Sequence, residues 1–428
     1  MACAPPEPSF NVSEPVVITG YAQISSLGTT LAELDDAIRH VRSGVSAFSL
    51  DLPGIDRAEV AVSRVMWDSS RATAPSKVLM DRGTALALRV TEDAITQAAI
   101  DRPVEAPHRL GVYWGSGMAG AHTFDQSCFA LYEQHRRMRP TNVVSIMPNA
   151  PAAEIALSLR AQGACLSFAC ACASSAVALG EALHAIRSGR LDWAVVGGSE
   201  SMLTPGVIAS WQAMRVMAPA GENPALACKP FDANRNGFAL GEGAAALVLE
   251  SRQHALQRGA RPLAILSGYG TSSDGVHITN PDQGGQVRAM RAALQDANLS
   301  PGDIGYINAH GTATHAGDIT EAHSIGEVFG ERKVPVSSTK ALHGHLLGAG
   351  GALELVIALR SLATLELPVA ANLTEQDPRI SLQLVRPGEA HAPHLKHVMS
   401  NAFAFGGTNA VLIASAIHSN EASVPGQS

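Results

Sequence analysis

The order of strand-like and helix-like segments repeats once along this chain, and this repetition constrains the fold more than any other feature of the sequence. In the first half, a strand-like run, an amphipathic helix and a second strand are expected at residues 15–21 (PVVITGY), 90–99 and 110–117 (LGVYWGSG). The second half has the same order at residues 263–269 (LAILSGY), 287–297 and 304–311 (IGYINAHG). Strands alternating with helices favour an α/β fold. The matching order predicts two similar units packed face to face with a site between them. Chance similarity of α/β segments is the alternative.

The boundary between the two units is predicted in the charged stretch of residues 251–262, which follows a strand-like run at residues 244–249. We therefore assign residues 15–256 to the first unit and residues 257–417 to the second. Residues 1–14 lack the basic region and apolar core of a signal peptide. We expect residues 1–14 and 418–428 to be loose tails.

The composition is that of a core-rich globular protein, with 46% hydrophobic and 16% charged residues in a chain of 428. A net charge of −7 and only 4% aromatic residues argue against nucleic acid as the main partner. The six cysteines form no CxxC pair and no zinc-ligand spacing, as expected for reduced thiols in a cytoplasmic protein. No apolar run is expected to reach the roughly 18–20 residues of a membrane span.

Cys172 lies where a short apolar strand runs directly into a helix. Apolar residues three and four positions apart predict the buried face of that helix, and a glycine predicts its end: Ala176, Leu179, Leu183, Ile186 and Gly189. At such a corner the free N–H groups and dipole of the helix favour a thiolate, which is the nucleophilic form of cysteine. The alternative is that Cys172 is a small buried apolar residue.

Two histidine-rich stretches could act with this cysteine. Residues 308–318 (NAHGTATHAGD) place His310 at the end of a strand, and residues 337–350 (SSTKALHGHLLGAG) contain Lys340, His343 and His345. Few acids are near and no HExxH spacing occurs, which argues against a metal site. Loop histidines with ordinary hydrogen bonds are one interpretation. Beside a thiolate, they would instead suit acyl transfer with carbanion chemistry, in which the histidines donate hydrogen bonds and the lysine fixes their charge state.

Two glycine-rich turns are less specific as indicators of function. Residues 115–120 (GSGMAG) fit GxGxxG after a strand, but the charged segment at residues 129–139 (FALYEQHRRMR) does not supply the second strand and acid of a dinucleotide site. Residues 399–409 (MSNAFAFGGTN) predict a tight turn whose N–H groups could point at an oxyanion, although alone this is a generic turn signal.

Taken together, these stretches resemble the elongating β-ketoacyl-acyl-carrier-protein synthases, which are condensing enzymes of the thiolase-like superfamily. The resemblance runs from residue 16 to residue 413. It is carried by the order of these motifs: 171–174 (ACAS), 229–232 (KPFD), 236–243 (NGFALGEG), 308–314 (NAHGTAT) with 317–318 (GD), 338–340 (STK), 344–348 (GHLLG) and 401–409 (NAFAFGGTN). It implies an α/β, duplicated thiolase-like fold: two similar βαβαβ-type halves, with mixed sheets sandwiching buried helices.

The resemblance implies a catalytic set. Cys172 matches the acylated nucleophile, and His310 and His345 match the two catalytic histidines. Lys340 and Glu354 match supporting positions around them.

It also implies the walls of the substrate site. The backbone N–H groups of Cys172 and Phe405 would form the oxyanion hole, and Phe405 matches an aromatic that gates the acyl pocket. Met118 matches a residue that limits chain length near the dimer interface, and Thr312 and Thr314 match substrate-binding positions.

Carrier-protein docking is expected at Arg215 and Lys77. The segment at residues 76–82 (SKVLMDR) keeps only part of the basic run that relatives use, and residues 135–139 form the densest basic cluster, which could equally be a solvated helix face. Ala404 replaces the glycine usual between the two phenylalanines. These departures indicate a specialised carrier protein or acyl chain.

The implied reaction is a decarboxylative Claisen condensation, in fatty-acid or polyketide- or polyene-type biosynthesis. A carrier-protein thioester acylates Cys172, a malonyl thioester loses CO2, and the resulting carbanion attacks the Cys172 thioester. No metal or other cofactor is expected. The expected partners are acyl and malonyl forms of an acyl carrier protein, and a second identical or related subunit.

The sequence argues against three alternatives to this reaction. A thiolase would need a second cysteine late in the chain, but none follows Cys228. An initiating condensing enzyme would carry Asn where His345 lies. A chain-length-factor-like subunit, which pairs with a synthase without condensing, usually lacks the nucleophile that Cys172 supplies.

Overall fold

The computed structural model describes residues 14–51, 57–69, 72–76 and 80–417. Almost all of the predicted tails, and Lys77 of the predicted docking site, lie outside the described residues.

Eleven strands form one continuous mixed sheet, in the order β12-β11-β10-β13-β14-β9-β1-β8-β6-β4-β5. The first half of the chain contributes β1 (Val16–Ile24), β4 (Leu110–Gly115), β5 (Cys165–Phe168), β6 (Trp193–Glu200) and β8 (Gly243–Ser251). The second half contributes β9 (Ala264–Ser273), β10 (Tyr306–Asn308), β11 (Pro335–Ser337), β12 (Gln383–Leu384), β13 (His397–Phe403) and β14 (Thr408–Ser415). β1 and β9 pair at the centre, where the two halves meet.

The two half-sheets have the same topology, which confirms the predicted duplication. Outward from the centre, β1-β8-β6 and β9-β14-β13 are antiparallel. Next, β6-β4-β5 and β13-β10-β11 are parallel. The short sequence matches at residues 15–21 and 263–269 fall on the equivalent strands β1 and β9. The sequence similarity between these two segments therefore reflects their equivalent positions in the two half-sheets.

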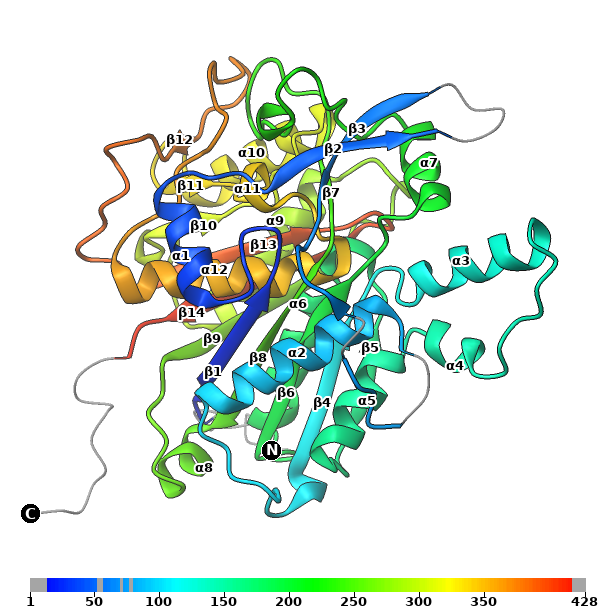
Figure 1. The fold of residues 1–428 in the computed structure, drawn as a ribbon. Coiled ribbons are helices and arrows are strands. Elements are labelled where there is room, and N and C mark those ends of the chain that lie inside the picture. Colours follow the sequence, from blue (N-terminus) through cyan, green and yellow to red (C-terminus); the bar gives the residue numbers. More distant parts are fainter. Residues whose placement is uncertain (1–13, 52–56, 70–71, 77–79, 418–428) are drawn as a thin grey trace, which may run out of the picture.

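Two helices are buried between the half-sheets, as the resemblance implies. They are α6 (Ser174–Arg187) and α12 (Gly350–Thr364), and the label of α12 lies in the middle of Figure 1. Gly351 allows their close approach, because a Cβ there would lie 2.9 Å from the Cβ of Ala176. The hydroxyl of Ser175 on α6 accepts a hydrogen bond of 2.9 Å from the N–H of Ala352 on α12. The helix starts are thus fixed relative to each other.

Leu347–Thr364 is long and apolar enough to cross a membrane, judged by length and composition. The expectation that no apolar run reaches this length is therefore wrong. However, 83% of this stretch is buried within the protein. Apart from Glu354 and Arg360, it is largely apolar because it is covered in the core, as is typical of a central helix.

The outer faces of the sheet are covered by other helices. α2 (Arg82–Gln97) and α5 (Ala150–Leu159) cover the first half-sheet, and α9 (Gln283–Asp296) and α10 (His315–Phe329) cover the second (Figure 1). The predicted helix at residues 90–99 begins earlier, because Asp81 caps the N-terminus of α2 by accepting a hydrogen bond from the Gly83 N–H.

The remaining elements of the described chain are a small sheet and six further α-helices, of which α11 (Lys340–His343) is buried. A small sheet contains β2 (Val45–Leu50), β3 (Ala58–Ser63) and β7 (Leu240–Gly241). The other helices are α1 (Leu31–Arg39), α3 (Ala121–Tyr132), α4 (Asn142–Ile146), α7 (Pro205–Ala213), α8 (Arg252–Gln257) and α11. α3 and α4 project from the body at the right of Figure 1.

A buried carboxylate ties the central strands to α8. Glu250 on β8 accepts hydrogen bonds from Thr19, from His254 Nδ1 (2.6 Å) and from Arg258 (2.5 and 2.8 Å). Burial alone would raise the pKa of Glu250, but the hydrogen bonds from Arg258, His254 and Thr19 outweigh it and lower the pKa to about 2.

We predict that Glu250→Gln lowers the free energy of unfolding by about 1–3 kcal/mol at pH 7, because it leaves Arg258 without its charged partner. A lowered pKa in the folded state stabilises the protein above the unfolded-state pKa and ceases to do so as the pH falls. The difference between wild type and variant in urea unfolding should therefore narrow from about pH 4.5 down toward pH 2. A difference that stays constant over this range would contradict the role of the charge.

Candidate active site

Cys172 lies at the predicted corner between strand and helix. β5 ends at Phe168, a short 3-10 turn spans Ala171–Ala173, and α6 starts at Ser174. Ala171 has a φ of +46°, a left-handed conformation that is unusual for a residue other than glycine. The Ser174 hydroxyl donates to the Ala171 carbonyl (2.6 Å) and accepts from the Cys170 N–H (2.9 Å). These two bonds hold the strained corner in place.

Burial acts against the thiolate that the helix start is expected to favour, because the Cys172 side chain is only 7% exposed. Burial raises the pKa of the thiol to about 12, although Lys340 and the N–H groups of Phe405 and Cys172 act in the opposite direction. A thiol with a raised pKa is protonated at pH 7. Removal of the proton must therefore be coupled to a neighbouring base.

His345 is in direct contact with the nucleophile. Its Nε2 lies 3.0 Å from the Cys172 Sγ. The His310 ring lies edge-on to the His345 ring, with centroids 5.4 Å apart. Burial, and next the charge of Lys340, hold the pKa of both imidazoles well below the usual value. Both histidines are thus neutral at physiological pH, and each can donate one N–H.

The two predicted supporting residues form a buried ion pair. Lys340 at the start of α11 bonds Glu354 on α12, and neither side chain is more than 1% exposed. A buried charge is tolerated only when it is paired. The ammonium group of Lys340 is also among the causes that lower the pKa of His310, His345 and the Cys172 thiol. This agrees with the expectation that the lysine fixes the charge state of the histidines.

The glycine-rich turn at residues 404–407, here called the gating turn, lies over the cysteine. Gly406 and Gly407 have φ values of +86° and +77°, which confirms the predicted tight turn. The N–H groups of Phe405 and Cys172 are among the causes that act to lower the pKa of the Cys172 thiol. The oxyanion hole expected from these two N–H groups stays a prediction.

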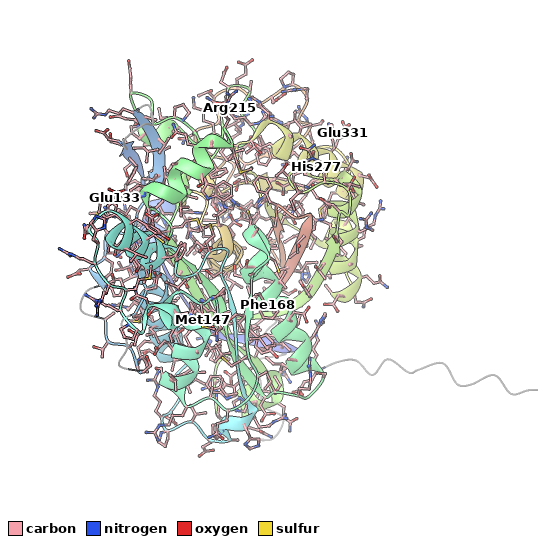
Figure 2. The ribbon with its side chains drawn as sticks, turned by 90° about the vertical axis from the view of Figure 1, so that its right-hand side faces the viewer. Glu133, Met147, Phe168, Arg215, His277 and Glu331 are labelled. Carbon is pink, nitrogen blue, oxygen red and sulfur yellow. The ribbon has the colours of Figure 1, made fainter. Side chains whose placement is uncertain are left out.

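One cavity, of about 380 Å³, brings together most of the predicted residues. Its lining includes Cys172, His310, His345, Phe405, Thr312, Thr314 and Arg215. The hydroxyls of Thr312 and Thr314 lie 3.0 Å apart. Arg215 follows the end of α7, and both Arg215 and His277 are labelled in Figure 2.

Met118 does not line this cavity, and 43% of it is exposed. Its N–H donates to Glu200, a buried carboxylate that also accepts from the N–H groups of Gly117 and Gly348. Glu200 therefore joins the Met118 turn to the loop that follows His345.

Sequence reasoning missed several residues that shape the site. Glu321 on α10 accepts from the N–H groups of His310 (2.8 Å) and Gly311 (2.7 Å) and from the Asn401 side chain (3.1 Å). It fixes the turn that carries His310. The only local signal is an acid on the buried face of an amphipathic helix. Trp211 was also missed, since a lone tryptophan is normally interpreted as core.

Ligand atoms of Cys172, His310 and His345 lie within 4.8 Å of one another, so they could hold a metal ion. Thiolate and imidazole are common zinc ligands. The hydrogen bond between His345 and Cys172 accounts for the same closeness without an ion. The expectation of a metal-free site stays a prediction.

Comparison with known proteins places these features in a family. The chain matches the beta-ketoacyl synthase N-terminal domain over residues 13–255 and the C-terminal domain over residues 263–374. It is 38% identical over 409 residues to nodulation protein E of Rhizobium leguminosarum bv. trifolii, covering 93% of this chain and 98% of that protein. It is 37% identical over 339 residues to 3-oxoacyl-[acyl-carrier-protein] synthase 2 of Staphylococcus aureus, covering 78% of this chain and 84% of that protein.

Solved structures of ketosynthases have the same fold. A beta-ketoacyl synthase from Burkholderia phymatum STM815 superposes with a TM-score of 0.85 at 33% identity, over 95% of this chain and all of that one. A type II polyketide ketosynthase in complex with its acyl-carrier protein gives 0.86 at 27% identity, and the ishigamide ketosynthase/chain length factor gives 0.85 at 30%. Each covers 95% of this chain and 100% of its own. With the duplicated sheet and the buried cysteine between its two halves, these matches show that the chain belongs to the beta-ketoacyl synthase family.

Proposed function

We propose that this enzyme joins an acyl group held on Cys172 to the two-carbon unit of malonyl-acyl-carrier protein, giving a β-ketoacyl-acyl-carrier protein and CO2. The observation that carries this proposal is the 3.0 Å contact between Cys172 Sγ and His345 Nε2, beside the ring of His310. The direct test is product formation by the purified protein with acyl- and malonyl-carrier proteins. Fatty-acid and polyketide-type pathways both supply such substrates, and a cytoplasmic location stays a prediction.

In the first half-reaction, the Cys172 sulfur attacks the carbonyl carbon of the acyl thioester. Because the thiol is protonated at rest, His345 accepts its proton as the carbon–sulfur bond forms. The oxyanion is stabilised by the N–H groups of Cys172 and Phe405. The tetrahedral species then expels the carrier thiol, which takes the proton back from His345.

In the second half-reaction, the malonyl thioester loses CO2 and its electron pair moves into an enolate. Neutral imidazoles of His310 and His345 donate hydrogen bonds to the enolate oxygen, which for His345 requires its proton to move from Nδ1, where acylation needs it, to Nε2. The enolate carbon attacks the Cys172 thioester, and the sulfur leaves as a thiolate that takes a proton from solvent. Burial, and next the charge of Lys340, keep both histidines neutral, so they donate hydrogen bonds without carrying a net charge.

Docking of an acidic carrier protein is supported by two basic features. Arg215 lies at the cavity that contains Cys172. A second hollow, of about 710 Å³, is lined by Arg64, Arg136, Arg137 and Arg139, and no Asp or Glu occurs among its described lining residues. Opposite charge steers such encounters, so docking should weaken as salt rises.

A second subunit, identical or related, is proposed on the face formed by β5, α3 and α4. More than half of the exposed large apolar side chains in the described chain fall between residues 118 and 166. β5 is the last strand of the sheet, so one side of it has no partner strand in the described residues. Figure 2 views this face, where Glu133, Met147 and Phe168 are labelled. In such a dimer Met118 would lie near the interface and could limit chain length.

We predict that Cys172→Ala abolishes both covalent acylation and condensation, because Cys172 carries the only thiol bonded to His345 among the described residues. Cys170→Ala should keep both, and it serves as the matched control two residues away. Intact-protein mass spectrometry after incubation with acyl-carrier protein measures the label. A label that persists in the Cys172 variant would refute the assignment, and an unlabelled wild type would favour a non-condensing partner subunit.

The rate of malonyl decarboxylation should fall by on the order of 100-fold or more in His310→Ala and in His345→Ala, because each change removes a hydrogen-bond donor to the enolate oxygen. His310→Ala should still accept an acyl group on Cys172. Release of CO2 and acyl labelling are measured on the same preparations. Normal CO2 release by both variants would exclude the proposed roles.

Leu166→Lys on β5 should shift the protein from dimer toward monomer, because it places a charge in the proposed apolar interface. Leu263→Lys is the matched control, since Leu166 and Leu263 are 46% and 40% exposed. Light scattering after gel filtration measures the mass. If Leu166→Lys has the same dimer mass as Leu263→Lys, the interface lies elsewhere.

A further inference from the structure

Trp211 on α7 is the centre of an aromatic group that reaches from the surface to the catalytic histidine. Its indole stacks on Phe405 of the gating turn, with centroids 6.1 Å apart and an angle of 25°. It also lies edge-on to Phe238 at 5.6 Å, and Phe238 lies edge-on to His345 at 5.3 Å. All four rings line the cavity that contains Cys172.

The gating turn is held from two sides. On one side the Gly406 N–H donates a 2.7 Å hydrogen bond to the Ile278 carbonyl, and on the other the Phe405 ring packs on Trp211. Ala404 begins the turn, and its Cβ removes conformations that glycine would allow. Movement of Phe405 therefore requires loss of the contact with Trp211.

Outside this cavity, side chains fill part of the space beside Cys172. Met118 does not line the cavity. Beside Cys172 lies a packed apolar cluster that includes Met202, Ile208 and Leu347, all at most 3% exposed. A chain on Cys172 must therefore displace side chains. Phe405 is the lining residue on a two-glycine turn, whereas Phe238 is buried, so Phe405 is the side chain most able to move.

We propose that Trp211 is a positioning residue that stabilises Phe405 in the closed position and thereby sets the rate at which long acyl chains load onto Cys172. This inference rests on the proposed function, since it concerns the same thioester. An aromatic pair of this kind is worth roughly a 2- to 12-fold change in an equilibrium constant. Removing the stack should raise the population of open Phe405, and with it the loading rate, by that factor.

The experiment compares Trp211→Leu and Trp211→Phe with wild type. Rates of Cys172 acylation by a short and a long acyl-carrier protein are measured by quenched-flow mass spectrometry. Trp211→Leu should load the long chain roughly 2- to 12-fold faster and change the short chain less. Trp211→Phe retains an aromatic ring and should stay near wild type. Trp67→Leu is the matched control, because Trp67 is also half-buried but does not line the cavity.

A double-mutant cycle tests whether Trp211 acts through Phe405. In a Phe405→Leu background, Trp211→Leu should have no further effect on loading. Acylation of wild type should also change tryptophan fluorescence, and this change should be lost in Trp211→Phe and in Phe405→Leu. If wild type is acylated but Trp211→Leu loads the long chain no faster, or if its effect persists without Phe405, the positioning role is overturned. If wild type is not acylated at all, the proposed function fails instead.

Discussion

The contact between the two buried helices is the constraint on which the site depends. α6 and α12 lie between the half-sheets, and the Ser175 hydroxyl accepts the Ala352 N–H across their starts. Each helix follows a 3-10 turn that contains a left-handed residue, Ala171 before α6 and Leu347 before α12. Duplication thus produced two equivalent helix starts, one carrying the cysteine and the other following His345. Their close packing at Gly351 brings the nucleophile to the histidine.

Burial decides the electrostatics of this site. It raises the pKa of the Cys172 thiol and lowers the pKa of His310 and His345, so the resting site consists of neutral groups. The charge of Lys340 is matched by Glu354. A buried ion pair is seldom a net source of stability. In the proposed mechanism its effect is on chemistry, since the lysine adds to burial in keeping the imidazoles as neutral hydrogen-bond donors.

The walls of the cavity come from parts of the chain that are held by different kinds of contact. His310 is fixed by the bonds from Glu321 to the backbone of its turn, and His345 by its backbone bond to Ala239. The backbone of the gating turn is held by several hydrogen bonds, including those from the Gly406 N–H to Ile278 and from the Asp274 N–H to Gly407, whereas the Phe405 ring stacks on Trp211. In the proposed mechanism, the Phe405 side chain is the group that moves to admit an acyl chain. This division suits an enzyme whose reaction centre stays constant while its acyl group grows.

Local patterns in the sequence determined the α/β class, the duplicated order of elements, the corner at Cys172 and the glycine turn after Phe405. These depend on periodicity, helix signals and turn residues, which act over a few positions. The catalytic set came from motifs in a fixed order. The tertiary structure alone decided the protonation of Cys172, because burial depends on distant segments that cover it. It also decided the roles of Glu321 and Trp211 and the place of Met118. Trp211 and Phe405 are far apart in the chain and meet only because α7 and the gating turn close over the same cavity.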